Sequence, residues 1–116
     1  MKRHLTAALG VSLLCCPPAM SQDSRYDWGP VTGAHITVVE ATYVPDRVTF
    51  QVDANASASC PAGTWLTWPA QGPDTPSKQA NVQAVFALLL AAKLSKDTVN
   101  LFGRNAGCSV NFIHIQ

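Results

Sequence analysis

The segment Pro76–Leu94 constrains the fold more than any other, because it is the one stretch that reads clearly as a long helix. Its large apolar residues recur three or four positions apart, the spacing of one face of an α-helix. They are Val82, Val85, Phe86, Leu89 and Leu90. Good helix formers fill most other positions. Thr75 is placed to cap the first turn, and Pro76 fits the first helical position, where an N–H would have no partner.

Short segments with strand character lie on both sides of this helix. The expected strands cover residues 34–43, 48–53, 64–68, 98–102 and 108–115. In the second of these, Val48, Phe50 and Val52 share one face, which we expect in the core. The last carries apolar residues on both faces, so its pattern leaves the buried face open.

The order of these elements is β-β-β-α-β-β, with the helix between the third and fourth strands. This is the order of a five-stranded barrel of the OB type. We therefore expect a mainly β protein with one α-helix and an OB-fold barrel. A hairpin-plus-helix α+β sheet is the alternative.

The first 21 residues have the pattern of a secretory signal peptide. A basic start precedes an apolar run too short to span a bilayer, and Ala19-Met20-Ser21 supplies small residues for cleavage before Gln22. We expect a secreted or periplasmic protein whose single domain covers residues 22–116. Lipidation of Cys15 or Cys16 is the alternative.

Two cysteines remain after residue 21, Cys60 and Cys108. A pair of thiols in a small exported domain usually forms one disulfide. In an OB-type barrel the third and fifth strands are parallel neighbours. Cys60 comes just before the third strand and Cys108 starts the fifth, so the topology would bring them together.

The charge after residue 21 is nearly balanced. Six Lys and Arg face seven Asp and Glu, a formal charge of −1. This balance gives no electrostatic footprint for nucleic acid or an anionic membrane. We therefore expect no nucleic-acid partner.

Catalytic signals are weak. His35 and His114 lie within expected strands, where structural roles are the better interpretation, and no serine or cysteine nucleophile stands in a known motif. No carboxylate pair, metal-ligand cluster or phosphate loop is recognisable. The sequence thus predicts no enzyme, no cofactor and no metal site.

Large aromatic residues favour binding instead. Of Trp65 and Trp68, at least one is expected in the core. Trp28 lies beside Asp27 in a polar segment, residues 22–30, that we expect to form an irregular surface arm. Aromatic faces pack on the C–H patches of sugar rings while polar neighbours bond the hydroxyls, so Trp28 and Asp27 are candidate sugar contacts.

The run 31–37 (VTGAHIT), continuing to Phe50 and Val52, resembles the start of the B subunit of subtilase cytotoxin and related pentameric toxin B subunits. So do the spacing of Cys60 and Trp68, and the helix followed by a turn and a β-branched strand. The resemblance implies a secreted OB-fold subunit in a five-membered ring. It also implies binding of sialylated or related cell-surface glycans, and a catalytic A subunit as partner.

In that family a serine before the first strand contacts the sugar carboxylate. Thr32 stands at this position, followed by the shared Gly33, so the resemblance adds both to the glycan-site candidates. The family's cysteine in the second strand is replaced by Gln51, which leaves Cys60 to pair with Cys108.

Two functions from different classes follow. The first is a glycan-binding subunit that forms a ring-shaped homo-oligomer, with the helix facing the ring's centre. Val85, Leu88 and Leu90 are its expected interface, because the helix is more apolar than one barrel requires. The second is a monomeric or dimeric periplasmic protein-binding module, an inhibitor or envelope accessory protein, on the same fold.

Overall fold

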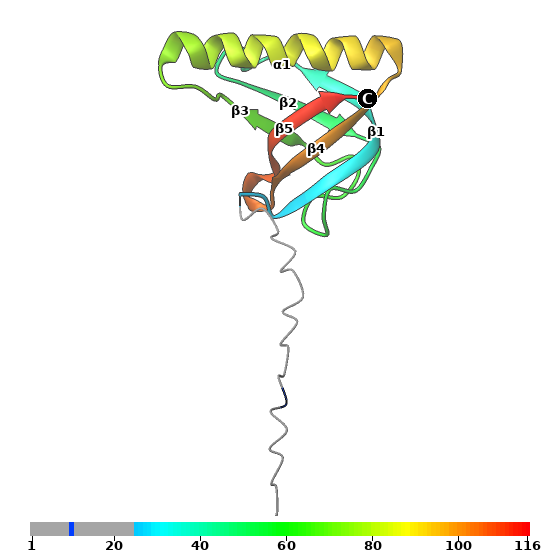
Figure 1. Ribbon diagram of the computed structural model, residues 1–116. Coiled ribbons are helices and arrows are strands. Elements are labelled where there is room, and N and C mark those ends of the chain that lie inside the picture. Colours follow the sequence, from blue (N-terminus) through cyan, green and yellow to red (C-terminus); the bar gives the residue numbers. More distant parts are fainter. Residues whose placement is uncertain (1–9, 11–24) are drawn as a thin grey trace, which may run out of the picture.

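The computed structural model describes Gly10 and residues 25–116, so the expected signal peptide, apart from Gly10, and the lipidation cysteines lie outside these residues. One helix lies across one end of a five-stranded sheet (Figure 1). The elements are β1 (Trp28–Glu40), β2 (Arg47–Val52), β3 (Leu66–Pro69), α1 (Thr75–Ser95), β4 (Thr98–Arg104), the short 3₁₀ helix η1 (Ala106–Cys108) and β5 (Ser109–Ile115).

The sheet closes on itself in the order β1-β2-β3-β5-β4, because β1 pairs with both β2 and β4. All neighbouring pairs are antiparallel except β3 and β5, which run parallel through Thr67 and Ser109. The expected disulfide is present, joining Cys60 to Cys108 with their Cα atoms 5.8 Å apart. The prediction of a mainly β protein with one helix and this disulfide is confirmed.

Helix α1 begins one residue before the predicted start, and its cap is Asp74 rather than Thr75. Asp74 Oδ1 accepts a hydrogen bond from the Ser77 backbone N at 2.8 Å, which satisfies one of the unpaired N–H groups of the first turn. The Ser77 side chain first, and then this bond from its backbone N, lower the pKa of Asp74, because both favour the charged carboxylate. Lys96 ends the helix in a left-handed conformation at φ 61°.

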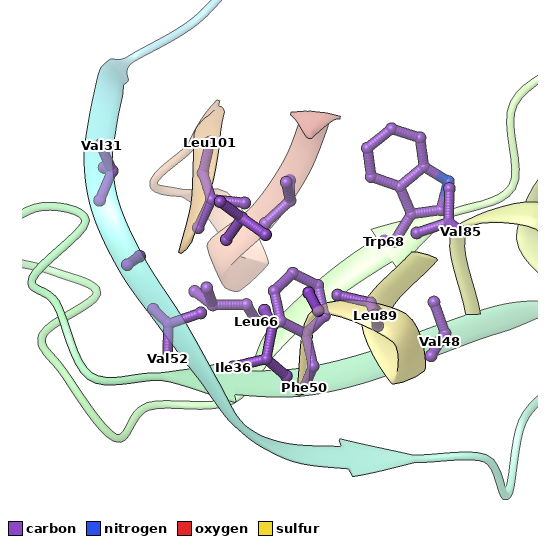
Figure 2. Packing of buried hydrophobic residues seen from close by; sticks show 14 of the residues in the cluster. Val31, Ile36, Val48, Phe50, Val52, Leu66, Trp68, Val85, Leu89 and Leu101 are labelled. Carbon is purple, nitrogen blue, oxygen red and sulfur yellow. The ribbon is translucent and has the colours of Figure 1, made fainter. Parts of the chain in front are cut away.

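The helix buries one face against the sheet. Its buried residues are Val82, Val85, Leu89 and Ala92. Figure 2 shows Leu89 turned toward the same interior as Phe50 and Leu66, and all three are fully buried. Val48 and Val52 join Phe50 in this core, as the alternation of β2 predicts. Packing against the sheet therefore fixes the helix in place.

Strand β1 is longer than predicted because it is bulged. It starts at Trp28 instead of residue 34, and its pairing with β4 shifts register between Trp28 and Val31 and again between Val31 and Ala34. The inward-facing residues at the start of β1 are therefore three sequence positions apart, a spacing that a search for strict alternation does not detect. The expected irregular arm is wrong from Trp28 onward.

A bulge also decides the buried face of β5. Val110 pairs with Gly103 and Phe112 with Phe102, so Asn111 is the extra residue. Val110 and Ile113, three positions apart, consequently both pack toward the core, while Phe112 is exposed. The sequence left this choice open because both faces are apolar.

Candidate functional site

The predicted sugar contact Trp28 is a core residue. Only 7% of it is exposed, and it packs with the other buried residues inside the closed sheet. A side chain at Gly103 on β4 would collide with the Trp28 ring, so this glycine makes room for the indole. Trp28 is therefore not available to a ligand at the surface. Trp68 is also buried, whereas Trp65 is exposed, which confirms that at least one of these two fills the core.

Asp27 forms hydrogen bonds to the end of β4 and to the start of the connection between β4 and β5. Its backbone N donates to Gly103 O at 2.8 Å, and its Oδ2 accepts from the Asn105 N at 3.0 Å. Thr32 and Gly33 are exposed further along β1. At about 3.3 Å per residue, Thr32 lies at most roughly 16 Å further along the chain than Asp27, which directly precedes the strand. The four predicted contacts thus do not form one site.

The two histidines each bond to a side chain on a neighbouring strand or turn. His35 Nδ1 lies 2.9 Å from Asp53 Oδ2, and the His35 backbone N donates to Asp53 Oδ1 at 2.7 Å. The bond from the backbone N is the main reason that the pKa of Asp53 is lowered. His114 Nε2 lies 3.1 Å from Asn100 Nδ2.

A polar depression of about 300 Å³ lies on the outside of the sheet. We call it the arginine pocket, and it is lined by Arg25, Tyr26, Gln71, Arg104 and Asn111. These residues come from the segment before β1, the loop between β3 and α1, the end of β4 and the bulge in β5. The fold therefore assembles the pocket from four separate segments.

Hydrogen bonds hold the walls of the arginine pocket together. Arg104 Nε donates to the Arg25 backbone O at 2.9 Å, and Gln71 Nε2 donates to the Asn111 backbone O at 3.2 Å. The Gln71 backbone N is itself held at 3.2 Å by Asn81 Oδ1 on the helix. The pocket is thus built by contacts between elements before any ligand arrives.

The pocket is positively charged and carries an aromatic ring. The Arg25 guanidinium carbon lies 5.9 Å from the Tyr26 ring centroid, within cation–π range. Within residues 25–116, Arg104 makes no ion pair, and only its Nε has a hydrogen-bond partner. Asn111 Oδ1 is buried without a partner among these residues. The terminal guanidinium N–H groups of Arg104 suit an anionic, oxygen-rich ligand.

Sequence reasoning named none of the five pocket residues as a site candidate. The one available signal is that Arg104 comes directly before the connection between the last two strands, since binding residues often lie in or beside such connections. Gln71 and Asn111 had no signal, because a loop contact and a bulge bring them to the pocket.

The structure buries part of the predicted oligomer interface and exposes the rest. Val85 is buried in the core of its own chain, and Leu88 is half-buried. Leu90 is 38% exposed and Leu94 is 84% exposed. Val85 is therefore not available to a second copy, because the sheet already covers it. Leu90 stays on the outer surface of the helix.

Searches of protein-family models, curated proteins and solved structures found no match for this chain. In the part of the chain that the structure describes, no three His, Cys, Asp or Glu side chains come together in a way that would hold a metal ion. None of the helices described is both long and apolar enough to cross a membrane.

Proposed function

We propose that this chain is a secreted glycan-binding protein of the OB type that holds an acidic sugar in the arginine pocket. The observation that carries the proposal is the pocket itself, which is lined by two arginines, a tyrosine, a glutamine and an asparagine. The protein acts as a B-subunit-like module that anchors or delivers by recognising cell-surface sugars, including sialylated ones.

The chemistry of the pocket matches each part of an acidic sugar. A guanidinium donates two parallel N–H bonds to a carboxylate, a geometry that the terminal nitrogens of Arg104 can adopt. The Tyr26 ring offers an apolar face to the C–H groups of a pyranose. Gln71 Oε1 would accept from a sugar hydroxyl and Asn111 Nδ2 would donate to one, since Gln71 Nε2 already donates within the protein and Asn111 Oδ1 is buried.

The topology supports the same assignment. The strand order β1-β2-β3-β5-β4 with a helix between β3 and β4 is what an OB-type barrel would show. Such barrels bind oligosaccharides and oligonucleotides with the loops that follow the first and fourth strands. Arg104 ends β4 and borders the second of these loops.

Glycan binding is tested by isothermal titration of N-acetylneuraminic acid into wild type, Arg104→Gln and Arg47→Gln. Arg47 is the matched control, because it is exposed and its guanidinium lies 3.8 Å from the Tyr43 ring in another loop. We expect Arg104→Gln to weaken binding at least about tenfold, the loss of one charge-assisted bond. Equal binding by all three proteins, or none by wild type, would refute the proposal.

Thr32 provides a competing position for the sugar. Its hydroxyl is exposed on β1, where the resemblance to toxin B subunits places a carboxylate contact. Thr32→Ala in the same titration separates the two positions. A loss of binding in Thr32→Ala with no change in Arg104→Gln would move the site from the arginine pocket to β1.

The proposed assembly is a ring-shaped homo-oligomer with a catalytic A subunit as partner. Its support is the apolar outer surface of α1, where Leu90 and Leu94 are exposed beside alanines. Light scattering on the purified protein tests this. A monomer would instead favour the alternative, a periplasmic protein-binding module that acts alone or as a dimer.

A further inference from the structure

A row of aromatic rings leads away from the arginine pocket across the outer face of β4 and β5. Tyr26, which lines the pocket, lies 5.2 Å from Phe102 between ring centroids. Phe102 lies 5.4 Å from Phe112, and Phe112 lies 5.4 Å from His114. We call these four residues the aromatic row. The first contact is tilted, at 42° between ring planes, and the other two are edge-to-face, at 82° and 75°.

The backbone is shaped to hold this row. Phe102 lies directly over Gly29 of β1, where an added Cβ would be 2.6 Å from Phe102 Cδ1. Phe102 and Phe112 are directly opposite each other on neighbouring strands, so their rings share one face of the sheet. Phe112 is nevertheless 42% exposed. The chain thus supports a large aromatic surface that its own core does not use.

A buried polar side chain underlies the far end of the row. Asn100 is only 8% exposed, and its Oδ1 has no hydrogen-bond partner in the described residues. Its Nδ2 lies 3.1 Å from His114 Nε2. A neutral His114 that accepts this bond carries its proton on Nδ1, which offers a donor to a hydroxyl. Burying an unsatisfied amide is costly, so we read Asn100 as serving to orient His114.

We infer that the ligand is an oligosaccharide whose acidic end sits in the arginine pocket and whose next sugars stack along the aromatic row. The inference rests on the proposed function. Tyr26 belongs to both surfaces, so a chain of sugars can pass from one to the other without a gap. Phe112 would take the stacking contact, and His114 would bond a hydroxyl at the far end.

A single-stranded nucleic acid also stacks its bases on aromatic side chains. It requires a cationic groove along the whole strand, because affinity comes mainly from its phosphates. Here both arginines lie in the pocket at one end, and no Lys or Arg belongs to the row beyond it. One anionic group followed by neutral rings fits this distribution better.

The test compares N-acetylneuraminic acid, the trisaccharide 3′-sialyllactose and lactose by titration calorimetry. Stacking on Phe112 predicts that the trisaccharide binds about three- to tenfold tighter than the monosaccharide. Phe112→Ala removes this gain and leaves the affinity for the monosaccharide unchanged. The exposed Tyr43 lies in the loop between β1 and β2, so Tyr43→Ala serves as the matched control and changes neither. The NMR signals of the His114 ring shift with the trisaccharide only.

The outcomes separate the two proposals. Monosaccharide binding that depends on Arg104, with no gain for the trisaccharide or no effect of Phe112→Ala, overturns the extended site and leaves the arginine pocket in place. Failure of wild type to bind either acidic sugar overturns both proposals. Tighter binding of a short thymidine oligonucleotide, abolished in Phe112→Ala, would reassign the aromatic row to single-stranded nucleic acid.

Discussion

Replacing Leu89 with alanine tests whether the helix is held by the sheet. Leu89 is fully buried at the contact between α1 and the sheet, and its neighbours in the core include Phe50 and Leu66, which are also fully buried. A buried Leu→Ala change costs about 2–5 kcal/mol, the sum of lost transfer free energy and the cavity left behind. Strands joined in a closed sheet cannot easily move in to fill a cavity, so we expect the upper half of that range, about 3–5 kcal/mol.

The assay is urea unfolding followed by circular dichroism, with the disulfide intact. A loss of about 3 kcal/mol corresponds to a fall in Tm of roughly 12–24 °C for a domain of this size. Leu94→Ala on the same helix is the control, because Leu94 is 84% exposed and its truncation should cost less than about 0.5 kcal/mol. Similar losses for Leu89→Ala and Leu94→Ala would show that the helix does not depend on the sheet as described.

Three further changes have definite expected results. Gly103→Ala should cost at least about 1–3 kcal/mol in urea unfolding, because the new methyl group meets both the backbone of β5 and a buried indole. Asp53 has a lowered pKa through its bonds to His35, so its stabilising contribution is complete above the ordinary carboxyl pKa and disappears as the pH falls through the lowered value. Because Asp53 is exposed, this contribution is under about 1 kcal/mol. It is measured by comparing how much the unfolding free energy of wild type and of Asp53→Asn changes between pH 6 and pH 2. Replacing Cys60 and Cys108 by serine should cost about 4 kcal/mol by chain entropy, since they lie 48 positions apart in the sequence.

For each of these three predictions, a specific result would contradict the structural explanation. Gly107 has a positive φ of 64° and open space around its Cβ position, so Gly107→Ala should cost about 1–2 kcal/mol from backbone strain alone. A smaller loss at Gly103 than at Gly107 would argue against the tight packing. If the unfolding free energy of Asp53→Asn has the same pH dependence as that of wild type, the bonds between Asp53 and His35 do not stabilise the fold. An unchanged Tm after reduction of the wild-type disulfide would contradict the cross-link estimate.

Much of the architecture was predictable because each signal was local. The helical spacing of Val82, Val85 and Leu89 reports which face is buried, and the structure buries that face. The alternation of Val48, Phe50 and Val52 does the same for β2. The pairing of Cys60 with Cys108 followed from their number and from the expected adjacency of the third and fifth strands. These inferences needed only periodicity and residue chemistry.

The candidate site was not predictable in the same way. Trp28 looked like part of a polar arm because Asp27 and the glycine and proline that follow it carry no strand signal. Three-residue spacing through bulges brings it into the core. The same kind of irregularity places Asn111 at the arginine pocket and exposes Phe112. A bulge inverts the inward and outward faces of a strand. Gly29 and Gly33, both with positive φ, stand in the two bulges of β1, whereas the bulge in β5 contains no glycine.

The sequence by itself determined the helix, the order of the strands, the apolar faces of α1 and β2 and the pairing of the two cysteines, because these depend on neighbours two to four positions away and on the count of cysteines. Tertiary structure alone decided which aromatic residues reach the surface and which polar side chains meet. Arg25, Gln71 and Arg104 become neighbours only when the sheet closes and the loop after β3 reaches the bulge in β5. The helix Pro76–Leu94 could thus be recognised from its sequence, whereas the pocket depended on contacts between segments far apart in the chain.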